Sequence, residues 1–582
     1  MWLKAFVGLF ACARVAVAWW DEATLQEQVQ FTDALLDSHS FVRLPGVYAH
    51  VKQHAAQLRA QITQTSALHF QDRSVSPRGN VVLPETKTYQ ELNMTQALDH
   101  FDGATNATFQ QRYFLDMHWY DSGASKRMRK NGKEIVPVIV YDGGESDIDA
   151  RRPMLETGIV RLLAEATGGI GIVLEHRYYG TSLPDRAALG NGSDWGVDQL
   201  RWLNTRQSLH DSASFIERMR FPGVGTDAEV RVIYYGGSYA GARAAFMRKT
   251  YPNLVHGAIA SSAVVGASVD LPEYYYAVAR YSPSKCAQAM QHAVHALDAI
   301  IAPSEEVNVT QADALRSLFN ASNVTSLDDF ASLVAVPLGI FQSNTWENDA
   351  RVSPWQRFCA SLVNGTRAAQ LRKEHALALA QLPSVPDTLL NWGDVVRGLL
   401  PESGDAWRMS DPSFFRQDGG VLSDNKAWTF QVCTEYGYYQ LAPPIPHLAT
   451  GQASGPKILS ARIDARLYQT LCDQGFTPGT HFAMPKTPNV SIPNAYGNMH
   501  LAVDRLAFID GQADPWRSMT PHSEEYAFGG NRPDTINRPF KLIPDCWHHC
   551  DSTALLNRTA EPERIQNVHN EQEAFVRAWL KE

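Results

Sequence analysis

The chain has 582 residues, of which 44% are hydrophobic and 19% charged, and its formal net charge is -9 at pH 7. This composition is typical of a globular protein long enough for more than one structural unit, and it excludes a disordered or coiled-coil chain. Because no basic block offsets the negative charge, the composition also argues against a nucleic-acid-binding protein.

The first 18 residues are typical of a secretory signal peptide. Lys4 precedes an apolar stretch over 5–13, and Ala16 to Ala18 form an A-x-A cleavage site. An uncleaved anchor is the alternative, but the apolar stretch is shorter than the roughly 18 residues that a membrane helix needs. The sequence therefore predicts export without a membrane partner: secretion, or alternatively delivery to a vacuole or lysosome.

The cysteines and the glycosylation sequons agree with export. Removing the signal peptide with Cys12 leaves an even number of cysteines, which suits disulfides in an oxidising compartment, although their pairing cannot be deduced. Sequons for N-linked glycans begin at Asn93, Asn106, Asn191, Asn308, Asn320, Asn323, Asn364, Asn489 and Asn557. We therefore expect a disulfide-bonded glycoprotein.

Short apolar runs that alternate with helical patterns dominate the chain after residue 84. The segment before them, 19–84, is polar with a helical pattern that is best developed over 47–62, and we interpret it as an N-terminal extension. The alternation predicts a parallel sheet with helices on both faces. We expect its strands over 135–142, 169–176, 230–235, 255–265, 505–510 and 539–544.

A mostly helical block interrupts this alternation between about residues 271 and 415. Such a block indicates a cap inserted into one α/β core. We therefore expect five segments: a signal peptide (1–18), an N-terminal extension (19–84), a first core part (85–268), a helical cap (269–425) and a second core part (426–582).

A serine stands where a strand pattern turns into a helical one, in the stretch GGSYAG (236–241). A nucleophile on such a sharp turn needs small neighbours, which Gly236 and Ala240 provide. Ser238 would lie at a helix N-terminus, whose dipole stabilises negative charge on oxygen. The alternative is a tight turn that happens to contain a serine.

A serine nucleophile needs a base, and the base needs a carboxylate that orients it; on this fold they follow in the order Ser, Asp, His. Asp510 and Asp514 follow the strand pattern at 505–510. The last strand pattern is followed by two histidines and two further aspartates, Asp545, His548, His549 and Asp551. We interpret Asp514 as the orienting acid and His548 or His549 as the base, although either carboxylate could instead form a turn or a cap.

The run CWHHC (546–550) also resembles a metal-ligand cluster. It lacks the Cys-x-x-Cys spacing of zinc sites, so we expect disulfides that hold the histidine loop, and no metal or cofactor. The oxyanion hole should combine the backbone N–H groups of Tyr239 and Gly144, the latter from a glycine-rich loop after the strand at 135–142. A plain glycine turn is the alternative for that loop.

Several motifs together make the sequence recognisable. They are QALDHF (96–101), YDGGESDI (141–148), EHRYYGTSLP (175–184), GGSYAGA (236–242), WTFQVCTEYGYYQ (428–440), DPW (514–516) and the HH-x-D loop (548–551). In this order, over about residues 90–555, the chain resembles the prolyl carboxypeptidase and dipeptidyl peptidase II family of secreted or lysosomal serine peptidases. EHRYYGTSLP together with GGSYAGA is highly specific, whereas DPW alone would be weak.

The resemblance implies an α/β-hydrolase core with a helical cap after the nucleophile, and a triad of Ser238, Asp514 and His548. It also implies an exopeptidase of the Pro-X carboxypeptidase or dipeptidyl peptidase type, which cleaves peptides on the carboxyl side of proline. Such a site needs an apolar pocket for the pyrrolidine ring, on which Trp516 could stack, and Glu145 could orient a substrate terminus. A core tryptophan and a loop anchor are the alternatives for these two residues.

Three places depart from the family pattern. GGES (143–146) replaces Gly-Asn-Glu-Gly, Asp510-Gly511 replaces Asn-Gly, and Cys546-Trp547 replaces small residues before the histidines. The triad survives these changes, but the shape of the pocket and the substrate terminus that the enzyme acts on do not follow from the resemblance. Two other hypotheses are therefore kept: an esterase or lipase of the same fold, and a catalytically inactive glycoprotein that only binds partners. A homodimer is one option for the oligomeric state.

Overall fold

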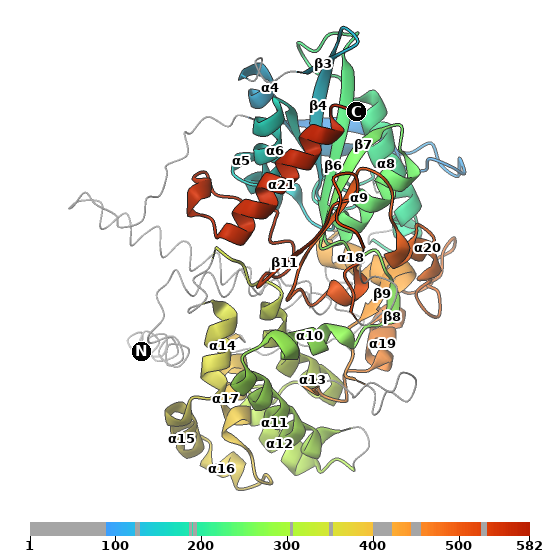
Figure 1. The fold of residues 1–582 in the computed structure, drawn as a ribbon. Coiled ribbons are helices and arrows are strands. Elements are labelled where there is room, and N and C mark those ends of the chain that lie inside the picture. The colour runs from blue at the N-terminus through green and yellow to red at the C-terminus, as the bar shows by residue number, and fades with distance from the viewer. Residues whose placement is uncertain are drawn as a thin grey trace, which may run out of the picture.

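The computed structural model describes residues 89–122, 128–185, 189, 195–302, 306–347, 353–399, 422–443, 456–524 and 532–582. The expected signal peptide and the N-terminal extension lie outside the described residues. Figure 1 shows a sheet flanked by helices in the upper part of the molecule and a group of helices below it.

The main sheet of the described residues has nine strands in the order β1-β2-β5-β4-β6-β7-β10-β11, with β3 paired to β4. The pairs β1–β2, β2–β5 and β3–β4 are antiparallel, and all other neighbours are parallel. The strands are β1 (Tyr89–Ala97), β2 (Thr108–Asp116), β3 (Met128–Lys130), β4 (Lys133–Asp142), β5 (Ile170–Leu174), β6 (Glu229–Gly237), β7 (Val255–Ser261), β10 (Leu506–Gly511) and β11 (Phe540–Ile543).

The six strands expected from the sequence are present as β4, β5, β6, β7, β10 and β11, with ends shifted by a few residues. They were detectable because helices cover both faces of the sheet, so that these strands are apolar almost throughout. The pair β1–β2 was not expected. Both strands are rich in polar residues: β1 is largely exposed, and β2 is mostly buried but places Gln110, Gln111 and Arg112 in its middle, so neither contains a long apolar run.

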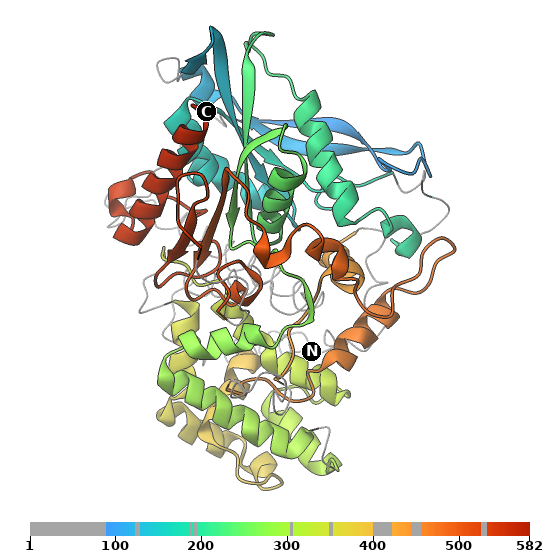
Figure 2. The same cartoon turned by 45° about the vertical axis from the view of Figure 1, so that its right-hand side comes forward.

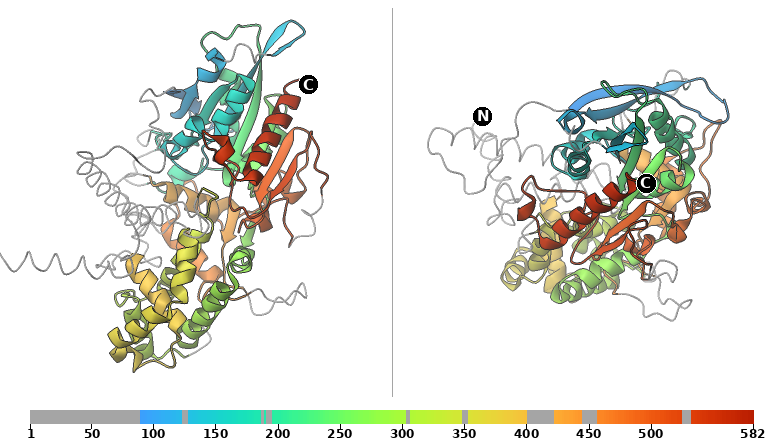
Figure 3. Two further views of the ribbon diagram at one scale, coloured as in Figure 1. Left: turned by 60° about the vertical axis from the view of Figure 1, so that its left-hand side comes forward. Right: turned by 45° about the horizontal axis from the view of Figure 1, so that its top comes forward.

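Helices cover the two faces of the sheet in pairs. Along β4, Ile139 and Tyr141 pack into the hydrophobic cluster of α6 (Ile159–Thr167) and α21 (Glu563–Trp579). Val138 and Val140 point the opposite way, as alternation along a strand requires, into the cluster with α8 (Thr205–Arg218) and α9 (Tyr239–Thr250). The left view of Figure 3 shows α21, in red, running along one face of the sheet.

Two helices follow the 3-10 turn after β4. They are α5 (Arg152–Glu156) and α6, separated at Thr157 and Gly158. At this break the N–H of Ile159, the first residue of α6, donates to the carbonyl of Ser552 after the histidine loop at 3.0 Å.

The helical group below the sheet comes from the middle of the chain (Figure 2). It contains α10 (Glu273–Tyr281), α11 (Ser284–Ile301), α12 (Val309–Leu318), α13 (Leu327–Ala335), α14 (Pro354–Leu362), α15 (Gly365–Glu374), α16 (Ala376–Leu379) and α17 (Asp387–Leu399). A disulfide between Cys286 and Cys359 links α11 to α14. We call this group the cap.

The remaining elements are shorter. They are α4 (His118–Ser122), α7 (Val197–Leu200), β8 (Ser268–Asp270), α18 (Asp424–Gln431), the π-helix η7 (Val432–Tyr436), β9 (Gly437–Tyr439), α19 (Ala465–Gly475) and α20 (Ser491–Asn494), with 3-10 turns η3 (Ile148–Arg151), η5 (Val336–Phe341), η8 (Asn498–His500), η9 (Arg517–Met519) and η10 (Arg558–Ala560). Within the described residues, no helix combines the length and apolar character that crossing a membrane requires.

The parallel strands, the helices on both faces and the serine turn between β6 and α9 together define an α/β-hydrolase fold. This confirms the fold class that the sequence predicts. The carboxyl ends of β4, β6 and β10 meet at one edge of the sheet, so the loops that follow them can build a single site.

Candidate active site

Ser238 lies on the sharp turn between β6 and α9. Its backbone has φ 61° and ψ -125°, a conformation that costs energy for a residue with a side chain and that clusters at functional sites. The turn is tight: a Cβ atom at Gly236 would lie 2.0 Å from the carbonyl oxygen of Ala240. The small residues of this stretch are therefore a steric requirement of the turn, as the sequence pattern suggests.

Asp514 and His548 are hydrogen bonded to each other. Asp514 Oδ2 lies 2.8 Å from His548 Nδ1, and both residues are buried, with exposed fractions of 0% and 6%. The backbone N–H of Trp516 donates to the other carboxylate oxygen at 2.9 Å, which fixes the orientation of Asp514. The His548 ring is thus held through Nδ1, and Nε2 is the nitrogen left for proton exchange.

Nε2 of His548 is buried and has no hydrogen-bond partner among the described residues. A hydrogen bond to Ser238 is therefore not formed in this state. Catalytic hydrogen bonds in enzymes without substrate are commonly long and tighten in the complex. The ring or the serine side chain therefore has to move until the two are within hydrogen-bonding distance before a proton can pass.

His549 has a different environment from its neighbour. Its backbone N–H donates to Ser262 Oγ at 2.8 Å, and its side chain lies against Gly237, where an added Cβ would be 3.4 Å away. The rings of His548 and His549 are 4.5 Å apart. Both histidines are therefore near the serine turn, and His548 is the one whose ring is bonded to the Asp514 carboxylate.

A cavity of about 10 Å³ lies beside Ser238 and is lined by Tyr141, Asp142, Gly143, Gly144, Glu145, Arg151, Gly237, Ser238, Ala240 and His549. This is about the volume of one water-sized group. The N–H of Tyr239 belongs to the first turn of α9 and has no acceptor within the helix. The N–H of Gly144 donates to Asp142 Oδ1 at 3.0 Å, so it would have to share or exchange this bond to act on a substrate oxygen.

The two residues expected to contact substrate are both buried. Glu145 lines the small cavity. Trp516, with 4% of its surface exposed, packs edge-on against Tyr274 and Tyr438, and its Nε1–H donates to Gln342 Oε1 at 2.7 Å. Trp516 is therefore part of an aromatic cluster between the sheet and the cap, with little of its own ring face exposed.

The other aspartates near the site are engaged elsewhere. Asp510 Oδ2 lies 2.5 Å from Nδ1 of His522. His522 lies in no recognisable motif, so the sequence did not indicate this contact. Asp551 is buried and accepts hydrogen bonds from Tyr235 and Gln572, and burial raises its pKa. These contacts separate Asp514 from the alternatives that the sequence left open.

The six cysteines remaining after Cys12 are all paired. The bonds join Cys286 to Cys359, Cys433 to Cys472, and Cys546 to Cys550. The last one closes a ring around His548 and His549, as expected from the sequence. Its sulfur atoms are bonded to each other and so are not thiolate ligands for a metal.

His176 lies directly behind the nucleophile turn. Its Nε2 is 3.0 Å from the hydroxyl of Tyr239, and its Nδ1 is 2.7 Å from the carbonyl of Arg177. Nδ1 must therefore carry the proton, and Nε2 accepts from the tyrosine. Burial, helped by the positive charge of Arg243, lowers the pKa of His176 from 6.5 to about 3.

This lowered pKa predicts a loss of stability in acid. Between pH 6.5 and 3 the unfolded chain binds a proton at His176 that the folded chain does not, so stability falls as pH falls through 6.5. At pH 5 the loss should be about 2 kcal/mol, from about 1.36 kcal/mol per pH unit. Urea unfolding at pH 7 and pH 5 measures it. In His176→Gln the loss between these two pH values should be smaller by that amount, and an unchanged loss would contradict the assignment.

The fold and the residues at this site are those of a serine hydrolase. Residues 96–528 match the family model described as Serine carboxypeptidase S28. The chain therefore belongs to the S28 family of serine peptidases, as the motifs predict.

Its relatives include named peptidases. The chain is 30% identical to a probable extracellular serine carboxypeptidase of Arthroderma benhamiae, covering 90% of this chain and 71% of the relative. It is 28% identical to the lysosomal Pro-X carboxypeptidase of Mus musculus (82% and 89% covered) and 26% identical to the mouse thymus-specific serine protease (84% and 87% covered). Among solved structures, a Mycobacterium smegmatis proline iminopeptidase aligns with a TM-score of 0.29 and 10% identity over 81% of this chain and 96% of that one, which is too low to inform on substrate.

Proposed function

We propose that this protein is a serine exopeptidase that cleaves peptide bonds after proline through an acyl-enzyme. Ser238 is the nucleophile, His548 the general base and Asp514 the carboxylate that orients it. The observation that carries the proposal is the buried hydrogen bond between Asp514 and His548 beside a serine turn, in a member of a serine peptidase family.

In the first half of the reaction, His548 Nε2 takes the hydroxyl proton while Ser238 Oγ attacks the carbonyl carbon. The N–H groups of Tyr239 and Gly144 stabilise the oxyanion, with Gly144 exchanging its bond to Asp142. The imidazolium then gives its proton to the leaving amine, and the C–N bond breaks. In the second half a water molecule, deprotonated by His548, hydrolyses the ester and restores the serine.

The preference for proline is supported by one relative. The aromatic cluster of Trp516, Tyr274 and Tyr438 beside the Asp514 loop is buried, so it does not itself offer a surface for a pyrrolidine ring. The printed name of the mouse relative is lysosomal Pro-X carboxypeptidase. In the cavity beside Ser238, Glu145 would attract a free amino terminus and Arg151 a free carboxyl terminus, so the two exopeptidase types differ in which one is used.

Export is supported by the disulfides and by the sequons. Three disulfides are typical of an oxidising compartment. The sequon asparagines of the described residues are all exposed: Asn93, Asn106, Asn308, Asn320, Asn323, Asn364, Asn489 and Asn557. We therefore propose a secreted or lysosomal glycoprotein.

The test is a panel of matched peptides analysed by mass spectrometry. One peptide series varies the residue before the scissile bond between proline and alanine, and a second blocks the amino or the carboxyl terminus by acetylation or amidation. Cleavage should follow proline and should need one free terminus, which identifies the exopeptidase type. Hydrolysis of short-chain esters without peptide cleavage would contradict the proposal and would favour an esterase.

A further inference from the structure

A short segment of the cap, residues 342–346, contacts both loops that carry the Asp514–His548 pair. It lies between η5 and the cap helix α14 and contacts the loops at the edge of the sheet. We call it the cap bridge. Its two ends, Gln342 and Trp346, each make one buried hydrogen bond to a different loop.

The Gln342 end reaches the loop of Asp514. Gln342 Oε1 accepts the indole N–H of Trp516 at 2.7 Å and the hydroxyl of Tyr274 at 3.1 Å, and all three residues are buried. Trp516 in turn donates its backbone N–H to the carboxylate of Asp514. The bridge therefore contacts the orienting carboxylate through a single intervening residue.

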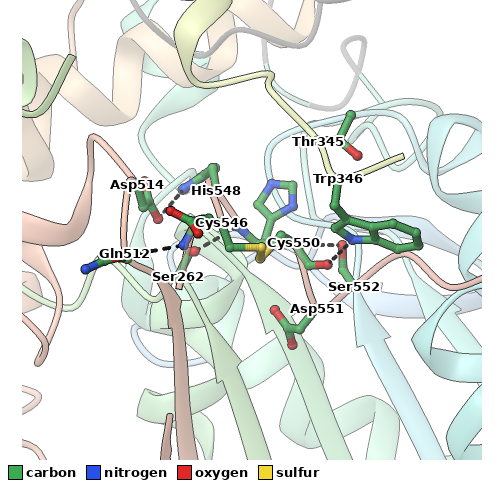
Figure 4. The surroundings of a disulfide bond; sticks show 12 residues. Ser262, Thr345, Trp346, Gln512, Asp514, Cys546, His548, Cys550, Asp551 and Ser552 are labelled. Carbon is green, nitrogen blue, oxygen red and sulfur yellow. Dashed lines mark hydrogen bonds and ion pairs between the residues drawn. A yellow bond between two sulfur atoms is a disulfide. The ribbon is translucent and has the colours of Figure 1, made fainter. Parts of the chain in front are cut away.

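The Trp346 end reaches the loop of His548. The indole N–H of Trp346 donates to the carbonyl of Cys550 at 2.7 Å, and its ring is buried in the cluster under α6 and α21. Cys550 is bonded to Cys546, so this contact holds the ring that contains His548. Figure 4 shows Trp346 on one side of this disulfide and Asp514 with His548 on the other.

The two loops are also tied to each other. The N–H of Ala513, the residue before Asp514, donates to the carbonyl of Cys546 at 2.8 Å. The cap bridge, the Asp514 loop and the disulfide ring thus form a closed set of contacts around the dyad. Loss of the Gln342 acceptor would leave the buried indole N–H of Trp516 without a partner, and loss of the Trp346 donor would leave the carbonyl of Cys550 without one; a loop can relieve this by moving.

We propose that the cap bridge positions the catalytic dyad, with Gln342 and Trp346 as positioning residues. The cap then does more than cover the site: it holds the acid loop and the base loop at the distance at which the Asp514–His548 hydrogen bond forms. This inference rests on the proposed function, because it assumes that this dyad activates Ser238. The alternative is that the bridge only attaches the cap to the core.

The test uses Trp346→Phe, which keeps an aromatic ring but removes the N–H donor, and Gln342→Leu, which removes the acceptor. Trp392→Phe is the matched control, because the Trp392 indole also donates to a carbonyl, that of Val334 at 2.8 Å, but entirely within the cap. The readout is the inactivation of the full chain by a fluorophosphonate, resolved into kinact and KI. We expect kinact to fall about 10- to 100-fold in both bridge variants with little change in KI, and by less than about 3-fold in the control.

A double-mutant cycle separates positioning from general destabilisation. In the Asp514→Asn background the hydrogen bond between residue 514 and His548 is already impaired. Trp346→Phe should therefore lower kinact by less than about 3-fold there. An equal loss in both backgrounds, or a loss no larger than that of Trp392→Phe, would overturn the inference. Should Trp346→Phe not fold, as judged by urea unfolding, Gln342→Leu supplies the same cycle. Failure of the proposed function has separate signatures: wild-type Ser238 would not be labelled if the dyad does not activate it, and an esterase would be labelled but would not cleave the peptide panel.

Discussion

Replacing Ser238 with alanine should abolish peptide hydrolysis and remove all covalent labelling by a fluorophosphonate. The substitution removes only the hydroxyl group, and alanine keeps the Cβ that the strained turn already accommodates. Loss of a serine nucleophile lowers kcat by about 10⁴- to 10⁶-fold in serine peptidases, because the acyl-enzyme route closes. Peptide turnover and labelling, followed by mass spectrometry of the labelled peptide, measure both effects.

The control is Ser518→Ala. Ser518 lies four residues after Asp514, and its buried hydroxyl has no hydrogen-bond partner among the described residues. Its removal should leave turnover and labelling within a few-fold of wild type. Persistent labelling of the Ser238→Ala protein at another residue would refute the nucleophile assignment, and an absence of labelling in the wild type would favour a protein that only binds partners.

Replacing Asp514 with asparagine should lower kcat/KM by about 10⁴-fold. An asparagine side chain fits the same space, but its amide can no longer hold the Nδ1–H tautomer or stabilise the imidazolium. The protein should still fold, because the backbone N–H of Trp516 can donate to the amide oxygen in place of the carboxylate. Steady-state kinetics on a cleaved peptide, together with urea unfolding, separate the catalytic effect from the structural one.

Asp510→Asn is the matched control for this change. Asp510 contacts His522 and not the histidine loop, so its loss should reduce stability more than it reduces turnover. The pair His548→Ala and His549→Ala then identifies the base. We expect His548→Ala to be nearly as inactive as Ser238→Ala, and His549→Ala to retain far more activity. The opposite order would transfer the role of base to His549.

Much of this fold is visible in local sequence patterns. The strands β4, β5, β6, β7, β10 and β11 are apolar runs because both faces of the sheet are covered. Ser238 is recognisable because a strand, two glycines, a serine and a small-residue helix can only be joined by a sharp turn. The pair β1–β2 is rich in polar residues even where β2 is buried, so no long apolar run separates it from a loop.

The site is only partly readable in this way. The order of Ser238, Asp514 and the two histidines along the chain, and the even number of exported cysteines, could be predicted from residue types and spacing alone. Which histidine meets Asp514 could not be predicted in that way, and only the family resemblance implied His548. Adjacent residues point in different directions, so the choice depends on the loop, where His549 has φ 37° and a disulfide joins Cys546 to Cys550.

The amino-acid sequence by itself determined the fold class, the nucleophile turn, the family and the residue types of the acid and the base, because each depends on neighbours close along the chain. Only the tertiary structure decided the partners: His548 for Asp514, His522 for Asp510, the three cysteine pairs, and the cap bridge across both loops. These pairs join residues whose approach depends on how strands, loops and cap pack together in three dimensions, and no local pattern encodes that packing.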